Sequence, residues 1–237
     1  HFIYLLDSIG YSFAGVFQHS QRMKRNIRSG PGILGRRKVI GIGFTGHFED
    51  SHARGLPFGQ NHKTGDARIS GALASLVGLE YALETDDERG VDDAIKLILM
   101  LHGMIMSFGG IPLLYYGDAL GTLNDDSFRD DPQKQGDTRW VHRPSIDWEQ
   151  AARRNTSGTV EYKIFSALKK MIAVRKEIHV FADFNNRELI DVENPNLFVF
   201  GRYHLKKHHE QVLVVANFDS KPQYLNLQDL GPWAPQY

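Results

Sequence analysis

The sequence contains no cysteine among its 237 residues, which excludes disulfide bonds and thiolate metal sites. That absence is compatible with a cytoplasmic location and with a secreted or periplasmic one, and we slightly favour the cytoplasm. An excess of charge is also missing, because 28 Lys and Arg residues balance 28 Asp and Glu residues. No uncharged apolar run approaches the roughly 18 residues of a membrane-spanning helix, and no signal peptide is visible. We therefore expect neither a nucleic-acid partner nor a membrane partner.

A chain of this length could form one large domain or a domain with a small appendage. It begins at His1 instead of Met, inside an apolar run that looks like a strand. We therefore expect the chain to be part of a longer protein.

The stretch Leu101–Asn124 is the one around which the rest is organised. Its apolar run Ile111–Tyr116 lies between Gly110 and the pair Gly117-Asp118. Such a run between turn residues is typical of a strand buried on both faces of a parallel sheet. Asp118 would then follow the carboxyl end of that strand, where α/β enzymes place their chemistry. The pattern predicts an α/β enzyme scaffold and leaves the reaction open.

Apolar periodicity predicts the other elements. We expect helices over Ser70–Glu84, Thr85–Phe108 and Thr156–Glu177, the second of them opening on a Thr85-x-x-Glu88 capping box. His102 lies in the apolar part of that second helix and is expected to be a core histidine with its hydrogen bonds satisfied. Beyond the third helix the helical period is replaced by alternation along the chain. This pattern predicts antiparallel strands at Arg187–Val192, Leu197–Tyr203, Gln211–Phe218 and Gln223–Leu227.

Two sequence patterns resemble ligand-binding motifs, but the residues around them do not fit such sites. Gly30–Gly35 spells G-x-G-x-x-G, but a basic segment precedes it where a dinucleotide site requires a strand. His204, His208 and His209 flank a Lys-rich turn, which favours a solvated hairpin over a metal site. We expect no cofactor and no metal.

Several motifs together carry a resemblance to a known family. The segment GIPLLYYGD at Gly110–Asp118 resembles the eighth barrel strand of the α-amylase superfamily of glycoside hydrolases. The segments GTLNDD at Gly121–Asp126 and DTRWVHRP at Asp137–Pro144 are similar to one branch, amylosucrase and its sucrose-hydrolase relatives. The resemblance implies an α/β fold: strands seven and eight of a (β/α)8 TIM barrel with their helices over residues 1–180, then a small antiparallel β-sandwich over residues 181–237.

The same resemblance implies roles for four residues. Asp7 matches the catalytic Asp that stabilises the oxocarbenium-like transition state. Arg68 matches an Arg that hydrogen-bonds the fructosyl or acceptor sugar, a task for which its rigid fork of donors is suited. Arg139 matches an Arg that closes the glucosyl pocket by pairing with an Asp absent from this chain. Asp118, at the end of the eighth strand, is expected to bind substrate.

Each of these residues also has a plainer interpretation. Asp7 could cap a turn, while Arg68 and Arg139 could be surface residues paired with the neighbouring Asp66 and Asp137. In addition, Leu6, Ser8 and Ala119 stand where the family has His, Asp and Glu. These departures favour a relative that binds sugar without cleaving it.

The resemblance implies glucosyl transfer from sucrose or α-glucosides, or their hydrolysis, by a retaining mechanism. Retention uses a nucleophile and an acid/base, two carboxyl groups about 5 Å apart. In the family these follow barrel strands four and five, and no motif here resembles either one. We therefore expect this chain to be inactive alone and to have the N-terminal remainder of the barrel as its partner. The alternatives are a general α-glucosidase or α-amylase, and a non-catalytic sugar-binding relative.

Overall fold

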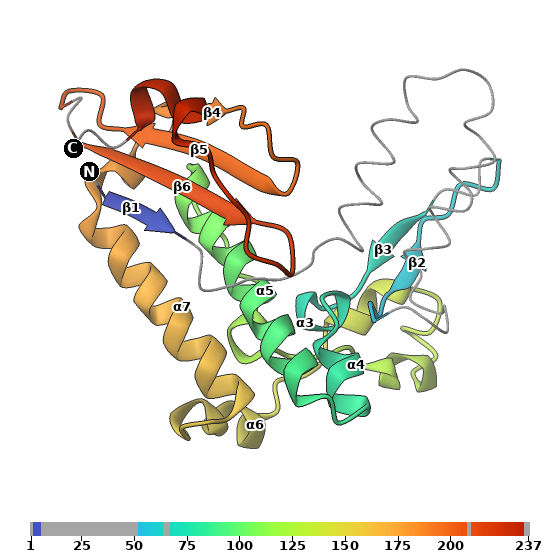
Figure 1. Cartoon of the computed structure of the whole chain (residues 1–237). Helices are drawn as coiled ribbons and strands as arrows, with labels where there is room; N and C mark the ends of the chain where they lie inside the picture. Colours follow the sequence, from blue (N-terminus) through green and yellow to red (C-terminus); the bar gives the residue numbers. More distant parts are fainter. Residues whose placement is uncertain (1, 6–51, 64–66, 208–209, 235–237) are drawn as a thin grey trace.

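The computed structural model describes residues 2–5, 52–63, 67–207 and 210–234. Helices and sheets are mixed in it. A four-stranded sheet lies at one end of two long helices, and a two-stranded sheet lies beside short helices towards their other end (Figure 1). Within the described residues, no helix is both long and apolar enough to cross a membrane.

The two long expected helices are present with shifted ends, whereas the first expected helix is divided and several short helices were not expected. The α-helices are α3 (Leu73–Leu76), α4 (Leu79–Glu84), α5 (Glu88–Phe108), α6 (Trp148–Ala152) and α7 (Val160–Glu177). The 3-10 helices are η1 (Asp118–Leu120), η2 (Asp126–Asp130), η3 (Thr138–His142), η4 (Arg153–Asn155), η5 (His179–Ala182) and η6 (Leu227–Trp233).

The helix expected over residues 70–84 is divided in two. Gly78 separates α3 from α4 with φ at +96°, a conformation that glycine adopts without steric cost. The expected capping box is wrong, because Asp86 has φ at +52° and α5 begins only at Glu88. The Thr85 hydroxyl instead donates to the Tyr81 carbonyl at 2.8 Å, at the end of α4.

The main core lies where α5 and α7 pack together (Figure 1). Ile98 and Met100 of α5 and Ile164 and Leu168 of α7 are at most 2% exposed. Ala216 of the sheet and Phe218, which follows directly after that strand, belong to the same cluster. The two long helices and the sheet therefore form one packed unit, and the segment that follows α5 continues directly from it.

The larger sheet has the order β1-β6-β5-β4. Strand β1 (Phe2–Leu5) runs parallel to β6 (Gln211–Asn217), whereas β5 (Leu197–Tyr203) and β4 (Arg187–Ile190) continue the sheet antiparallel. The expected strand over residues 197–203 is confirmed, and those over 187–192 and 211–218 are confirmed with shorter ends. The expected strand at 223–227 is wrong, because these residues are irregular and lead into η6. A second sheet facing the first is not formed by the described residues, so the β-sandwich is not confirmed.

The strand expected at Ile111–Tyr116 is also wrong. These residues have no regular secondary structure, and Ile111 and Leu113 are 80% and 82% exposed. A strand needs neighbours that pair with its backbone and cover its faces. Its expected neighbour β1 pairs with β6 instead, so the barrel portion is not confirmed. The division into domains at residue 180 stays a prediction.

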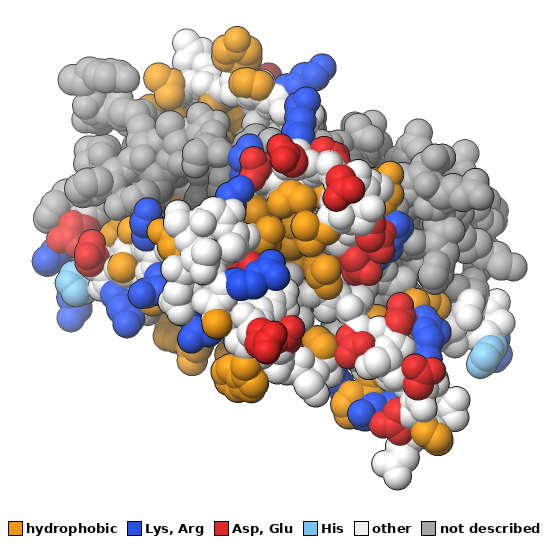
Figure 2. Space-filling model, turned by 90° about the horizontal axis from the view of Figure 1, so that it is seen from below, with side chains coloured by type: hydrophobic (Ala, Val, Ile, Leu, Met, Phe, Trp, Pro, Cys, Tyr) orange, Lys and Arg blue, Asp and Glu red, His pale blue; other side chains and the backbone are white. Residues whose placement is uncertain are grey.

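The face at the α4 and α6 end is mixed in charge. Figure 2 shows acidic and basic side chains interspersed around a group of hydrophobic ones. The described residues on this face therefore form no large field of one sign.

Candidate functional site

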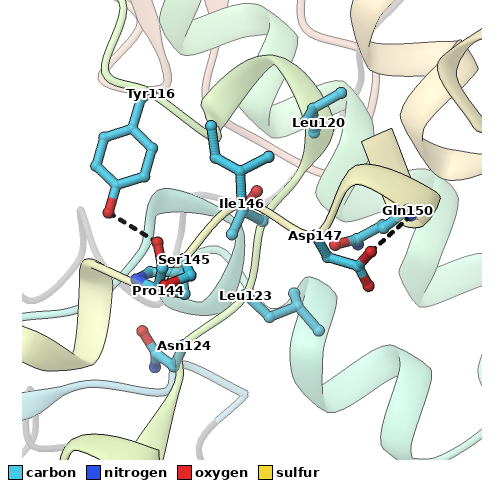
Figure 3. A pocket seen from close by; sticks show the side chains of 10 residues that line it. Tyr116, Leu120, Leu123, Asn124, Pro144, Ser145, Ile146, Asp147 and Gln150 are labelled. Atoms are coloured by element: carbon cyan, nitrogen blue, oxygen red, sulfur yellow. Dashed lines mark hydrogen bonds between the residues drawn. The ribbon is translucent and has the colours of Figure 1, made fainter. Parts of the chain in front are cut away.

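A pocket of about 230 Å³ lies between the segment that follows residue 115 and the segment that leads into α6 (Figure 3). One wall is formed by Tyr116 and residues 120–124, and the other by residues 144–147 with Gln150. Sites for drug-sized ligands are usually about 300–1,000 Å³. This pocket therefore has room for a group the size of one sugar ring.

Hydrogen bonds fix the two walls of the pocket. The Tyr116 hydroxyl donates to the Pro144 carbonyl at 3.1 Å and so connects one wall to the other (Figure 3). Burial, together with the neighbouring Tyr115, raises the pKa of the Tyr116 phenol. Asp147 accepts from the backbone N–H groups of Glu149 and Gln150 and thereby caps α6.

The polar groups around the pocket suit hydroxyl recognition. Thr122, Ser145 and Gln150 offer neutral donors and acceptors, and Asp147 offers the one carboxylate. Retaining hydrolysis needs two carboxyl groups about 5 Å apart. Among its described lining residues the pocket has a single carboxylate, Asp147, and that carboxylate caps a helix.

Asn124 joins the pocket to the first helices. Its side chain accepts from the Ala72 N–H at 2.8 Å and donates to the Arg54 carbonyl at 3.2 Å, while its own N–H donates to the Ser75 hydroxyl at 2.8 Å. The half-buried Glu80 lies beside this junction, and burial is the main reason that its pKa is raised. The motif residue Asn124 therefore holds the pocket wall in place.

Asp118 does not line the pocket and pairs with a histidine of α5. Its carboxylate lies 3.7 Å from Nε2 of His102, which is 1% exposed. Nδ1 of His102 bonds to the Ile98 carbonyl at 2.8 Å, so Nδ1 carries a proton. Burial alone lowers the pKa of His102, but the hydrogen bonds to Asp118 and Ile98 outweigh it, and the pKa is raised. His102 is a core histidine, as expected, and it also anchors η1.

Phe58 is the strand partner of Arg68, and its ring lies beneath Arg139. Strand β3 (Arg68–Ser70) pairs antiparallel with β2 (Leu56–Phe58), which sets the exposed Arg68 directly opposite Phe58. The Arg139 guanidinium lies over the Phe58 ring, 4.6 Å from its centre. Residues directly opposite in such a ladder project to the same side. Two of the four predicted site residues thus share one face of this small sheet.

Arg139 is held by Asp137, the N-cap residue of η3. Its guanidinium makes bonds of 2.7–3.0 Å to both carboxylate oxygens of Asp137. These bonds lower the pKa of Asp137 to about 2. This geometry matches the interpretation of Arg139 as a surface residue paired with Asp137. The Arg139 side chain is about half exposed. Asp7 and Asp66 lie outside the described residues, as do Leu6 and Ser8.

The sequence did not single out the pocket residues Tyr116, Ser145, Asp147 and Gln150. One available signal was Asp147, since an Asp before a helix is a common N-cap. Among the described residues, no group of three or more His, Asp and Glu side chains lies so as to hold a metal ion.

Comparison with known proteins gives one distant relative to consider. No family model matches the sequence. Over 100 residues, 42% of the chain, the sequence is 24% identical to glucosylglycerate phosphorylase of Escherichia coli (strain K12). The aligned part corresponds to 17% of the length of that protein. This similarity supports a relationship to carbohydrate-active enzymes and does not single out amylosucrase.

Proposed function

We propose that the chain is the C-terminal part of a carbohydrate-active enzyme that acts on sucrose or a related α-glucoside by a retaining mechanism. The observation that carries this proposal is the agreement of the sequence motifs with the distant relative. The ordered motifs from Asp7 to about Phe218 resemble the α-amylase superfamily, and the distant relative is a carbohydrate-processing enzyme. The N-terminal remainder of the barrel would supply the nucleophile and the acid/base.

In this proposal three of the four site residues contact the substrate and the fourth acts indirectly. Asp7 stabilises the transition state at the glucosyl unit. Arg68, paired in the small sheet with Phe58, and Arg139, which lies over the Phe58 ring, bind the hydroxyls of the acceptor or leaving sugar. Asp118 acts indirectly, because its pairing with His102 holds the segment that leads into the pocket.

A second candidate is phosphorolysis, in which phosphate takes the glucosyl unit in place of water or a second sugar. It is favoured by the name of the distant relative, a phosphorylase. The two candidates share a substrate class and differ in the acceptor.

One experiment separates these candidates. The chain is assayed alone and together with the N-terminal remainder of the barrel, with sucrose or glucosylglycerate as substrate, each with and without phosphate. Release of fructose without phosphate supports transfer or hydrolysis of sucrose, whereas formation of a glucose phosphate supports phosphorolysis. Conversion of maltose or starch in preference to both substrates would favour a general α-glucosidase or α-amylase. Binding of sugar without conversion would favour the non-catalytic relative, and the enzymatic proposal would be wrong.

A further inference from the structure

A second hollow, which we call the α7 groove, lies between the C-terminal end of α7, η5 and residues 112–114. Its volume is about 420 Å³. Most of its wall is apolar, with Met106, Leu114 and Phe181 among the residues that form it. Its polar wall consists of Arg175, Lys176 and His179, and none of its described lining residues is acidic. The groove is therefore apolar and basic at once.

Two of the basic side chains can still donate to a ligand. The Arg175 guanidinium donates one N–H to the Met106 carbonyl and one to the Gly110 carbonyl. A guanidinium has five N–H donors, so three remain without an acceptor among the described residues. Lys176 is exposed and forms none of the ion pairs found among the described residues.

More positive charge lies behind the apolar wall. Arg202 is 0% exposed and donates only to neutral acceptors, the Asn186 side chain and the carbonyls of Ser107, Val180 and Asp183. Burial, and then repulsion by Arg187 and Arg175, lowers the pKa of Arg202 to about 10. Its guanidinium lies 5.8 Å from the centre of the Phe181 ring, which lines the groove.

Among the described residues, no carboxylate is hydrogen-bonded to Arg175, Arg187 or Arg202, although the Asp183 carboxylate attracts Arg202. Arg175, Arg187 and Arg202 all donate to carbonyl groups near the end of α5, at Met106, Phe108 and Ser107 respectively. A nearby anion would reduce the mutual repulsion of these three groups. An anion in the α7 groove would lie beside the half-buried Arg175, which lines it.

We propose that the α7 groove binds a small amphipathic anion, a phosphate or carboxylate group on an apolar body. Arg175 and Lys176 take the charged group through charge-assisted hydrogen bonds. Met106, Leu114 and Phe181 cover the apolar body. This site is separate from the pocket at Tyr116 and does not depend on the proposed enzymatic function.

The test is a calorimetric titration of the whole chain with four probes: phenyl phosphate, benzoate, inorganic phosphate and phenol. We expect phenyl phosphate or benzoate to bind more tightly than either inorganic phosphate or phenol, because only the first two fill both parts of the groove. Comparison of the first two identifies the charged group. Phenol that binds as tightly as phenyl phosphate and benzoate, or no binding of any probe, would overturn the proposal.

Exposed lysines of one helix provide a matched pair of variants. Lys176→Gln removes a charge at the groove, whereas Lys170→Gln removes one from an exposed position of α7 outside it. We expect Lys176→Gln to weaken binding of the preferred probe about tenfold and Lys170→Gln to leave it unchanged. Both positions are exposed, so both variants should fold, which circular dichroism checks. Equal effects of the two changes would contradict the proposed site.

Discussion

The guanidinium of Arg139 lies over the ring of Phe58, 4.6 Å from its centre, although the two residues belong to distant parts of the chain. The same ring has Arg68 directly opposite it in the β2–β3 ladder. A planar guanidinium that is stacked on a ring and bonded to Asp137 keeps a fixed orientation. Lysine can reproduce its charge but neither its stacking nor its fork of donors.

We predict that Arg139→Lys lowers kcat/KM for the sugar substrate about tenfold or more when the chain is assayed with the remainder of the barrel. The matched control is Arg129→Lys. Arg129 also pairs with an Asp in the same loop, Asp126 at 2.8 Å, and also lies over a ring, that of Phe128. Equal losses in the two variants would show that Arg139 serves the loop and not the substrate.

The pair His102 and Asp118 should make stability depend on pH. The pKa of His102 is raised in the folded state above its ordinary 6.5. The folded state therefore binds the proton more tightly, and the resulting stabilisation is complete below pH 6.5 and is lost as the pH rises through the folded-state pKa. We predict that urea midpoints fall as the pH is raised through this window, and that Asp118→Asn makes the fall smaller.

His62 provides the control for this measurement, since it is exposed and lies far along the chain from α5. His62→Gln should leave the pH dependence as it is. An unchanged pH dependence in Asp118→Asn would mean that the contact between His102 and Asp118 contributes nothing to folding.

Asn124 should be important for stability, since its side chain satisfies two backbone groups from distant residues. Asn124→Ala would leave the Ala72 N–H and the Arg54 carbonyl without these bonds. We predict a loss of about 2 kcal/mol in the free energy of unfolding. The exposed Asn155 is a control position, where the same change should cost less than about 0.5 kcal/mol. Denaturant unfolding of both variants decides the question.

The helices and strands that could be predicted are those whose structure is determined by their own residues. Strand β5 has the bounds expected from the sequence, because it is rich in apolar and aromatic residues and the strands next to it in the chain, β4 and β6, pair with it. The segment 111–116 has an equally clear pattern, but whether it forms a strand depends on neighbours that its own residues cannot specify. The break at Gly78 was not predicted, because the apolar period continues across it, and its positive φ explains why the helix stops there.

The candidate site was predictable only where partners are adjacent in sequence. The pairing of Arg139 with Asp137 follows from their spacing, and the structure contains it. The meeting of Arg139 with Phe58 depends on how a long loop folds back, so local patterns do not contain it. Arg202 is a similar case, since an Arg in a strand reads as solvent-exposed and its four acceptors come from distant elements.

Arg202 should be among the positions where substitution costs most. Its guanidinium is buried and donates to four neutral groups, which no shorter or neutral side chain can reach in the same way. We predict that Arg202→Lys and Arg202→Met each lower the free energy of unfolding by about 3 kcal/mol or more. Arg187→Lys is the comparison, because Arg187 is exposed and donates to the Phe108 carbonyl alone among the bonds described. Its loss should be about 1 kcal/mol. Equal losses would contradict the importance of burial.

The segment 111–116 provides a test of the fold itself. In the structure Ile111 and Leu113 are largely exposed, whereas a barrel strand would bury them. Because both positions are exposed, the double substitution Ile111→Ser and Leu113→Ser should change the free energy of unfolding by less than about 0.5 kcal/mol. It should also reduce self-association. Leu168→Ala, at a core position that is 2% exposed, is the reference and should cost about 2–5 kcal/mol.

The double variant and the reference are compared by denaturant unfolding and by gel filtration, first in the chain alone and then with the remainder of the barrel. A small loss in the chain alone together with a loss as large as that of Leu168→Ala in the complex would show that the segment becomes buried on assembly. In that case the strand expected from the sequence forms only when its neighbours are present. A large loss already in the chain alone would contradict the exposed arrangement, because exposed side chains cannot contribute several kcal/mol through packing.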